Sequence, residues 1–156
     1  MKTTPKPSQI AILAGAVVLL IFSFLNFVKP SFGDGVSAWS GDFYFPLTIF
    51  PLLFGLIVGG TTAATLFADV KLPEQILTLN WKQINFMLSF TGLVILIGLL
   101  IGLPDGLDAG AGLLLSLLGA IALFAGSVME LLGIEVGGTT GAGSGPAAPG
   151  GPSTPF

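Results

Sequence analysis

One carboxylate inside an otherwise apolar stretch is the residue best placed to do chemistry. Glu130 is the only charged residue in the run Gly110–Ile134. A carboxylate about one turn inside a membrane boundary is costly alone and tends to find a partner. If residues 104–109 form a tight turn, the last two apolar runs pair as a hairpin and Glu130 falls beside Lys82. We expect either a Lys82–Glu130 ion pair that locks this end of the hairpin or a carboxylate that reaches the lipid headgroups.

The chain lacks the residue types on which most catalytic and metal sites depend. It contains no histidine, no cysteine and no arginine, which removes disulfides, thiolate or imidazole metal sites and the usual proton shuttle. A serine nucleophile would need a lysine as its base, and no apolar run contains a lysine. Asp105 and Asp108 are too few ligands for a calcium loop, and the glycine-rich residues 141–145 lack the lysine of a phosphate-binding loop. We therefore expect no catalytic residue, no metal, no cofactor and no enzymatic activity.

Four apolar runs must position these residues. Hydrophobic residues make up 53% of the 156-residue chain and charged residues 8%, and the mean hydropathy is +0.96. Each run has about 20 residues, roughly what a helix needs to cross a ~30 Å hydrocarbon layer; the runs are Ile10–Val28, Phe45–Phe67, Ile84–Leu103 and Gly110–Ile134. We predict an all-α membrane protein, with residues 10–134 forming a four-transmembrane-helix bundle of two antiparallel hairpins. Its partner is then the lipid bilayer, and the small net charge of −3 gives nucleic acid nothing to bind.

The lysines set the expected orientation. They stand at positions Lys2, Lys6, Lys29, Lys71 and Lys82. If both termini are cytoplasmic, every lysine except Lys29 faces the cytoplasm, as the positive-inside tendency favours. We expect a multi-pass protein of the cell membrane in which residues 1–9 are cytoplasmic.

The residues that follow the last run have a different composition. Residues 135–156 consist mainly of Gly, Ala, Ser, Thr and Pro, which are too poor in apolar mass to fold alone. We expect a disordered Gly/Pro-rich cytoplasmic tail. The alternative is a polyproline II edge that docks into a partner, because prolines recur at every third residue, namely Pro146, Pro149, Pro152 and Pro155.

Glycines recur at helical spacing in three of the runs. Four lie seven residues apart in the last run, which places them along one seam of a helix, and two other runs each contain a Gly-x-x-x-Gly pair. Small residues let a neighbouring backbone approach closely within lipid. Because the hairpin estimate sets Gly98 and Gly102 opposite Leu115 and Ala111, we expect the last two runs to pack closely. The expected packing glycines are Gly55, Gly59, Gly98, Gly102, Gly112, Gly119, Gly126 and Gly133.

Three aromatic residues flank the apolar runs. Trp39 lies in the first loop, Tyr44 where the second run begins, and Trp81 just before the third run. Trp and Tyr are enriched at membrane–water interfaces. We expect these three side chains to anchor the bundle at the two interfaces.

Four short segments carry a resemblance in layout: Phe22–Leu25, Ser37–Ser40, Leu72–Pro73 and Gly110–Gly112. With them, residues 10–134 resemble small actinobacterial four-span membrane proteins similar to the 34 kDa antigenic-protein-like family of mycobacteria. The resemblance implies an envelope-associated membrane protein with no catalytic residues to carry over. The tail of this chain is far shorter than that of the long-tailed members, so the resemblance implies nothing about a function carried by the tail.

These features favour a non-enzymatic accessory or scaffold protein that associates with other membrane proteins or with itself, in cell-envelope assembly or division. The alternative is a small oligomeric channel or transporter component. The polarity within the runs discriminates between the two, because mild hydroxyl and amide groups do not line a convincing ion route. The polar residues concerned are Asn26, Thr61, Thr62, Thr65, Ser89, Thr91, Ser116 and Ser127.

Overall fold

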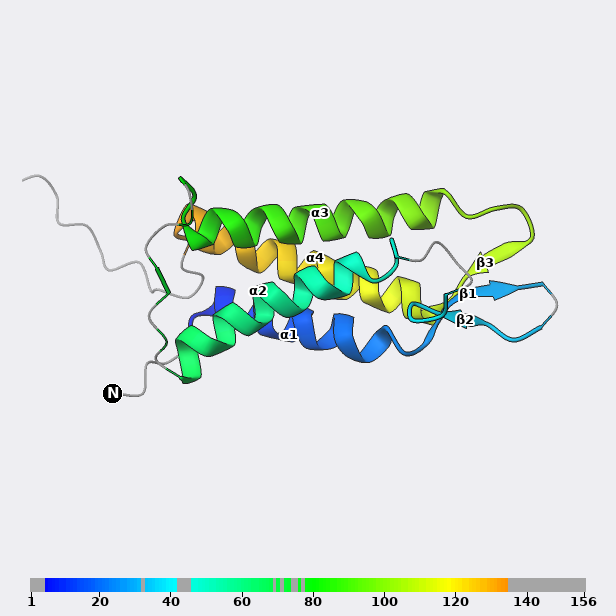
Figure 1. Cartoon of the computed structure of the whole chain (residues 1–156), viewed down its shortest axis with the longest axis horizontal. Coiled ribbons are helices and arrows are strands. Elements are labelled where there is room, and N and C mark those ends of the chain that lie inside the picture. The colour runs from blue at the N-terminus through cyan, green and yellow to red at the C-terminus, as the bar shows by residue number, and fades with distance from the viewer. Residues whose placement is uncertain are drawn as a thin grey trace, which may run out of the picture.

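Four helices lie along one another, and short strands cover one end of them (Figure 1). The computed structural model describes residues 5–31, 33–41, 46–68, 70, 72–73, 76 and 78–134. The helices in this part of the chain are α1 (Pro7–Phe22), α2 (Phe50–Phe67), α3 (Trp81–Ile101) and α4 (Ala111–Leu132). Residues 1–4, Tyr44 and the tail at 135–156 lie outside the described residues. The disordered tail therefore stays a prediction.

Three helices are long enough and apolar enough to cross a membrane, judged over the described residues by length and composition: α2, α3 and α4. The helix α1 is apolar but has only 16 residues, which corresponds to a rise of about 24 Å. Of the four predicted spans, three therefore contain a helix that could cross a membrane. The first apolar run, which contains α1, falls short of a full span as a helix.

The first apolar run was expected to be helical as far as Val28, and this prediction is wrong. The helix α1 ends at Phe22, and the chain continues as strand β1 (Asn26–Pro30). Ser23 caps this end, because its hydroxyl donates a hydrogen bond of 2.6 Å to the Leu20 carbonyl oxygen. The following Phe27 and Val28 are buried in β1, each with 1% of its surface exposed. The extended backbone is favoured here because two later segments supply pairing partners for it.

Those partners make a small antiparallel sheet that the sequence did not predict. Strand β1 lies between β2 (Val36–Ser37) and β3 (Leu107–Ala109). Both loops of this end thus contribute: Val28 pairs with Ala109 on one side and with Val36 on the other. The sheet ties the loop after α1 to the loop between α3 and α4, so it holds α1 against α4.

The ends of α3 and α4 follow local capping rules. Asn80 accepts a 2.9 Å hydrogen bond from the Gln83 backbone amide, and the Gln83 side chain accepts one from the Asn80 amide. This capping box starts α3 at Trp81, three residues before the expected start of the run at Ile84. At the other end of the chain, Gly133 has a φ of +67° and ends α4 in the left-handed conformation.

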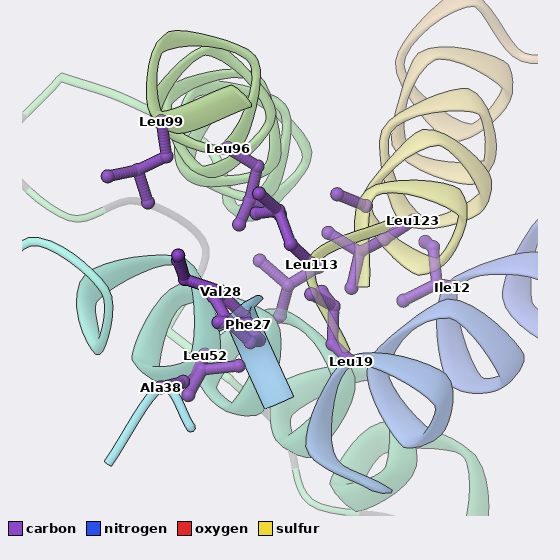
Figure 2. Packing of buried hydrophobic residues seen from close by; sticks show 12 residues of the cluster. Ile12, Leu19, Phe27, Val28, Ala38, Leu52, Leu96, Leu99, Leu113 and Leu123 are labelled. Atoms are coloured by element: carbon purple, nitrogen blue, oxygen red, sulfur yellow. The ribbon is translucent and has the colours of Figure 1, made fainter. Parts of the chain in front are cut away.

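The helix α4 is the central helix of the bundle. Its most extensive contact is with α1, followed by that with α3, while α1–α2 and α2–α3 are the other large contacts. The interior combines leucine and isoleucine side chains from α1, α3 and α4 with Phe27 and Val28 of β1, and Figure 2 shows them converging. Both hairpins of the predicted bundle are adjacent pairs, but neither forms the closest helix contact.

Candidate functional site

The exterior of the bundle exposes large apolar side chains, and several hydroxyl residues are buried beside its apolar core. Ile101 is 80% exposed and Phe67 is 76% exposed. In contrast, the hydroxyl residues Ser89, Ser116 and Ser127 are buried. A soluble monomer rarely exposes so many large apolar side chains, so the outer surface is suited to lipid or to another apolar helix.

The glycine seam of α4 faces α1. A Cβ built on Gly119 would lie 3.0 Å from the Gly15 carbonyl oxygen, and one built on Gly126 would lie 2.7 Å from the Ser8 carbonyl oxygen. Gly112 continues the seam against the Leu25 carbonyl oxygen at 2.6 Å. The two helices are antiparallel and in backbone contact along their length, which only residues without a Cβ permit.

The expected contact of this seam with α3 is therefore corrected. A Cβ on Gly98 would meet nothing within 4 Å, and one on Gly102 would meet only the Gly98 carbonyl oxygen of its own helix. The hairpin estimate assigned the seam to α3 because α3 is the neighbour of α4 in sequence. In the bundle α1 takes that face instead, since the sheet holds α1 against α4.

The other predicted glycines have separate roles. Gly55 and Gly59 of α2 lie against α1, beside Leu19 and the Ala16 Cβ respectively. Gly133 meets nothing within 4 Å and serves as the left-handed end of α4 rather than as a packing residue.

Two glycines on α3 form an uncovered site at the bundle surface. Both Gly98 and Gly102 are exposed. They line a hollow of about 230 Å³ together with Leu47, Ile95 and Leu99. No polar side chain of the described residues lines the hollow, so a partner would bind there through shape and close approach of the backbone rather than through side-chain hydrogen bonds.

A second site lies at the opposite end of the bundle from the sheet. Lys82 begins α3 and Glu130 lies in the last turn of α4, and both line the same two hollows. No salt bridge of 4.0 Å or less joins them within the described part of the chain. The structure thus brings together the two predicted residues without closing the ion pair, which stays a prediction.

The two described aromatic anchors lie at opposite ends of the bundle. The Trp39 indole stacks on Phe24 at a ring-centroid distance of 5.6 Å and donates a 2.9 Å hydrogen bond to the Ser23 hydroxyl. Trp81 donates a 3.0 Å hydrogen bond to the Pro73 carbonyl oxygen. This placement is what interface anchoring requires of the two indoles. Tyr44 lies outside the described residues.

Sequence reasoning missed two parts of these sites. The partner face on α1 was not assigned, although Ser8 and Gly15 lie seven residues apart and match the period of the α4 seam. Asn85 was also missed. It is 6% exposed and its side chain contacts Thr61; an amide within an apolar run is the signal that would have found it.

Among the residues that the structure describes, no group of three or more His, Cys, Asp or Glu side chains could hold a metal ion. Comparisons of the chain with protein-family models, with curated proteins and with solved structures give no match. The resemblance in layout and the non-enzymatic function therefore stay predictions, and the two surface sites above carry the functional argument.

Proposed function

We propose that this protein is an integral protein of the cell membrane, with both termini cytoplasmic, that acts as a non-enzymatic accessory or scaffold. It associates laterally with transmembrane helices of other membrane proteins. The membrane location is supported by three helices of sufficient length and apolarity and by an exterior that exposes large apolar side chains. The charges support this orientation. Lys6 and Lys82 lie at one end of the bundle, whereas Asp34, Asp105 and Asp108 lie in the loops and strands at the other end.

The observation that carries the proposal is the uncovered glycine pair on α3. Gly98 and Gly102 are one helical turn apart and face a hollow, whereas the glycines of α2 and α4 in similar motifs meet α1. Within lipid, a pair of small residues at this spacing lets a second helix approach closely enough for backbone contact. The occupant expected here is an apolar helix that presents small residues of its own.

Crosslinking tests this proposal, because the cysteine-free chain gives no background. An Ile95→Cys variant carrying a maleimide photocrosslinker places the probe in the hollow. We expect one defined crosslinked species in native membranes and its loss in a Gly98→Leu background. Gly60→Leu is the matched control, because a Cβ there also meets nothing within 4 Å but lies on α2.

The outcomes separate the alternatives. A crosslinked species that persists with Gly98→Leu, or that is lost only with Gly60→Leu, overturns the α3 surface as the association site. A crosslink to a second copy, recovered also with purified protein in bilayers, assigns self-association. Ion or solute flux from purified protein in liposomes would instead support a channel or transporter component and overturn the scaffold function.

A further inference from the structure

We propose that the lysine-bearing end of the bundle binds the headgroup of a phospholipid that carries both a primary ammonium and a phosphate. The inference rests on the membrane location proposed above but not on the α3 association surface. Its basis is a pair of polar hollows that share Lys82 and Glu130 as lining residues. The first hollow, of about 150 Å³, is lined by Thr61, Thr62, Thr65, Leu72, Trp81, Lys82, Asn85 and Glu130.

The second hollow lies beside the first and shares its charged wall. It has a volume of about 190 Å³, and Lys82 and Glu130 line it as well, together with Lys6, a second lysine that adds to the positive charge around a bound phosphate. Lys82 lies in the first turn of α3, as its second residue, and Glu130 lies in the last turn of α4, two residues before its end. In a bilayer-spanning bundle this is the depth of the lipid headgroups.

A buried amide facing the first hollow lacks a full set of partners. Asn85 is only 6% exposed, and the one side-chain hydrogen bond it makes within the described residues is a long contact of 3.4 Å that its Oδ1 accepts from the Thr61 hydroxyl, which leaves its two N–H donors without a partner there. Because a buried amide has two donors and an acceptor to satisfy, this leaves hydrogen-bonding capacity turned toward the hollow. An unsatisfied amide at such a place points to a polar ligand or to water.

The threonine hydroxyls add acceptors to the same wall. Thr62 donates its proton to the Val58 carbonyl oxygen at 2.8 Å and Thr65 to the Thr62 carbonyl oxygen at 2.9 Å, while Thr61 donates to the Val58 carbonyl oxygen at 3.0 Å and, at 3.4 Å, to Asn85 Oδ1. A hydroxyl whose proton is used can only accept. With the Glu130 carboxylate, the wall is rich in acceptors and suits a ligand with several N–H donors.

The charges specify the rest of the ligand. The Lys82 side chain is exposed and forms no ion pair with Glu130 of 4.0 Å or less among the described residues. A phosphate alone would be repelled by Glu130, and a simple cation would be repelled by Lys82. A phosphoethanolamine headgroup satisfies both, since its ammonium can bind the carboxylate and the hydroxyls while its phosphate binds the lysine. A choline headgroup has the same charges but no N–H donor.

The test compares two lipids that differ only in those donors. Purified protein is equilibrated with equimolar phosphatidylethanolamine and phosphatidylcholine of identical acyl chains, and the retained lipid is measured by native mass spectrometry. We expect a preference for phosphatidylethanolamine of about tenfold or more, as hydrogen bonds to charged groups produce. Glu130→Gln should remove most of this preference, whereas Lys82→Met should lower the retention of both lipids, because both carry the phosphate. The matched controls Asp108→Asn and Lys29→Met, at the sheet end, should keep the preference.

Equal retention of the two lipids by the unaltered protein overturns the inference, and so does a preference that survives Glu130→Gln. Binding of soluble phosphoethanolamine as tightly as of the lipid would show that the headgroup chemistry is right but would overturn a membrane lipid as the ligand. Circular dichroism of each variant verifies that it is folded. If the lipid preference is absent but the Gly98-dependent crosslink is present, only this inference is overturned. Recovery of the protein as a stable species in detergent-free buffer would overturn the membrane location itself.

Discussion

Gly15→Ala tests the α1–α4 contact most directly, because the added methyl group would meet backbone rather than a movable side chain. Its carbon would lie 2.6 Å from both the Gly119 carbonyl oxygen and the Leu123 amide nitrogen. Ordinary contact begins at 3.4 Å, so the two helices must separate locally by about 0.8 Å. Such overpacking costs about 1–3 kcal/mol, which lowers the folded-to-unfolded ratio by a factor between about 5 and about 150.

The control for this prediction is Gly98→Ala. Both substitutions add the same methyl group to a helix interior and bring the same gain in helix propensity, about 1 kcal/mol. At Gly98, however, the methyl group meets nothing within 4 Å. The difference between the two variants therefore isolates the steric cost of the α1–α4 contact.

The assay is reversible unfolding of dilute purified protein in dodecylmaltoside micelles with an increasing mole fraction of dodecyl sulfate, followed by far-ultraviolet circular dichroism. We expect Gly15→Ala to unfold at a lower fraction of dodecyl sulfate than Gly98→Ala, and Gly98→Ala to unfold at a fraction equal to or higher than that of the unaltered protein. Equal midpoints for the two variants would refute the backbone contact between α1 and α4.

Two further predictions concern the ends of helices. Ser23→Ala removes the acceptor of the Trp39 indole and should lower the free energy of unfolding by about 0.5–1.5 kcal/mol; in a Trp81→Phe background the emission of Trp39 should shift as well, and an unchanged spectrum and midpoint would contradict the hydrogen bond. Gly133→Ala places a Cβ on a residue with a φ of +67° and should cost about 1–2 kcal/mol in the same unfolding assay, while Gly133→Asn, which tolerates this conformation, should cost less. A loss with Asn as large as that with Ala would argue against a left-handed end of α4.

Local signals in the sequence predicted the helices well where a run is long and uninterrupted. The runs at 45–67, 84–103 and 110–134 each contain a helix that could cross a membrane, because apolar side chains throughout about 20 residues leave backbone hydrogen bonding within a helix as the favourable solution in lipid. The capping box of Asn80 and Gln83 and the left-handed Gly133 are also local, and the residue types at these positions account for the observed ends. The first run was misjudged at its end, because Asn26–Pro30 forms a strand only when β2 and β3 are present to pair with it.

The residues that are small enough for close packing, the apolar helices and the positions of the few charges can all be read from the order of the residues. The surfaces that these residues meet are set by the packing of the bundle. The seam of Gly112, Gly119 and Gly126 faces α1 rather than its sequence neighbour α3, which leaves Gly98 and Gly102 uncovered. The physical reason is that a helical period fixes a face but not its partner. Contacts between segments far apart in the chain, here the sheet and the antiparallel α1–α4 pair, select that partner through shape and backbone pairing that no local pattern contains.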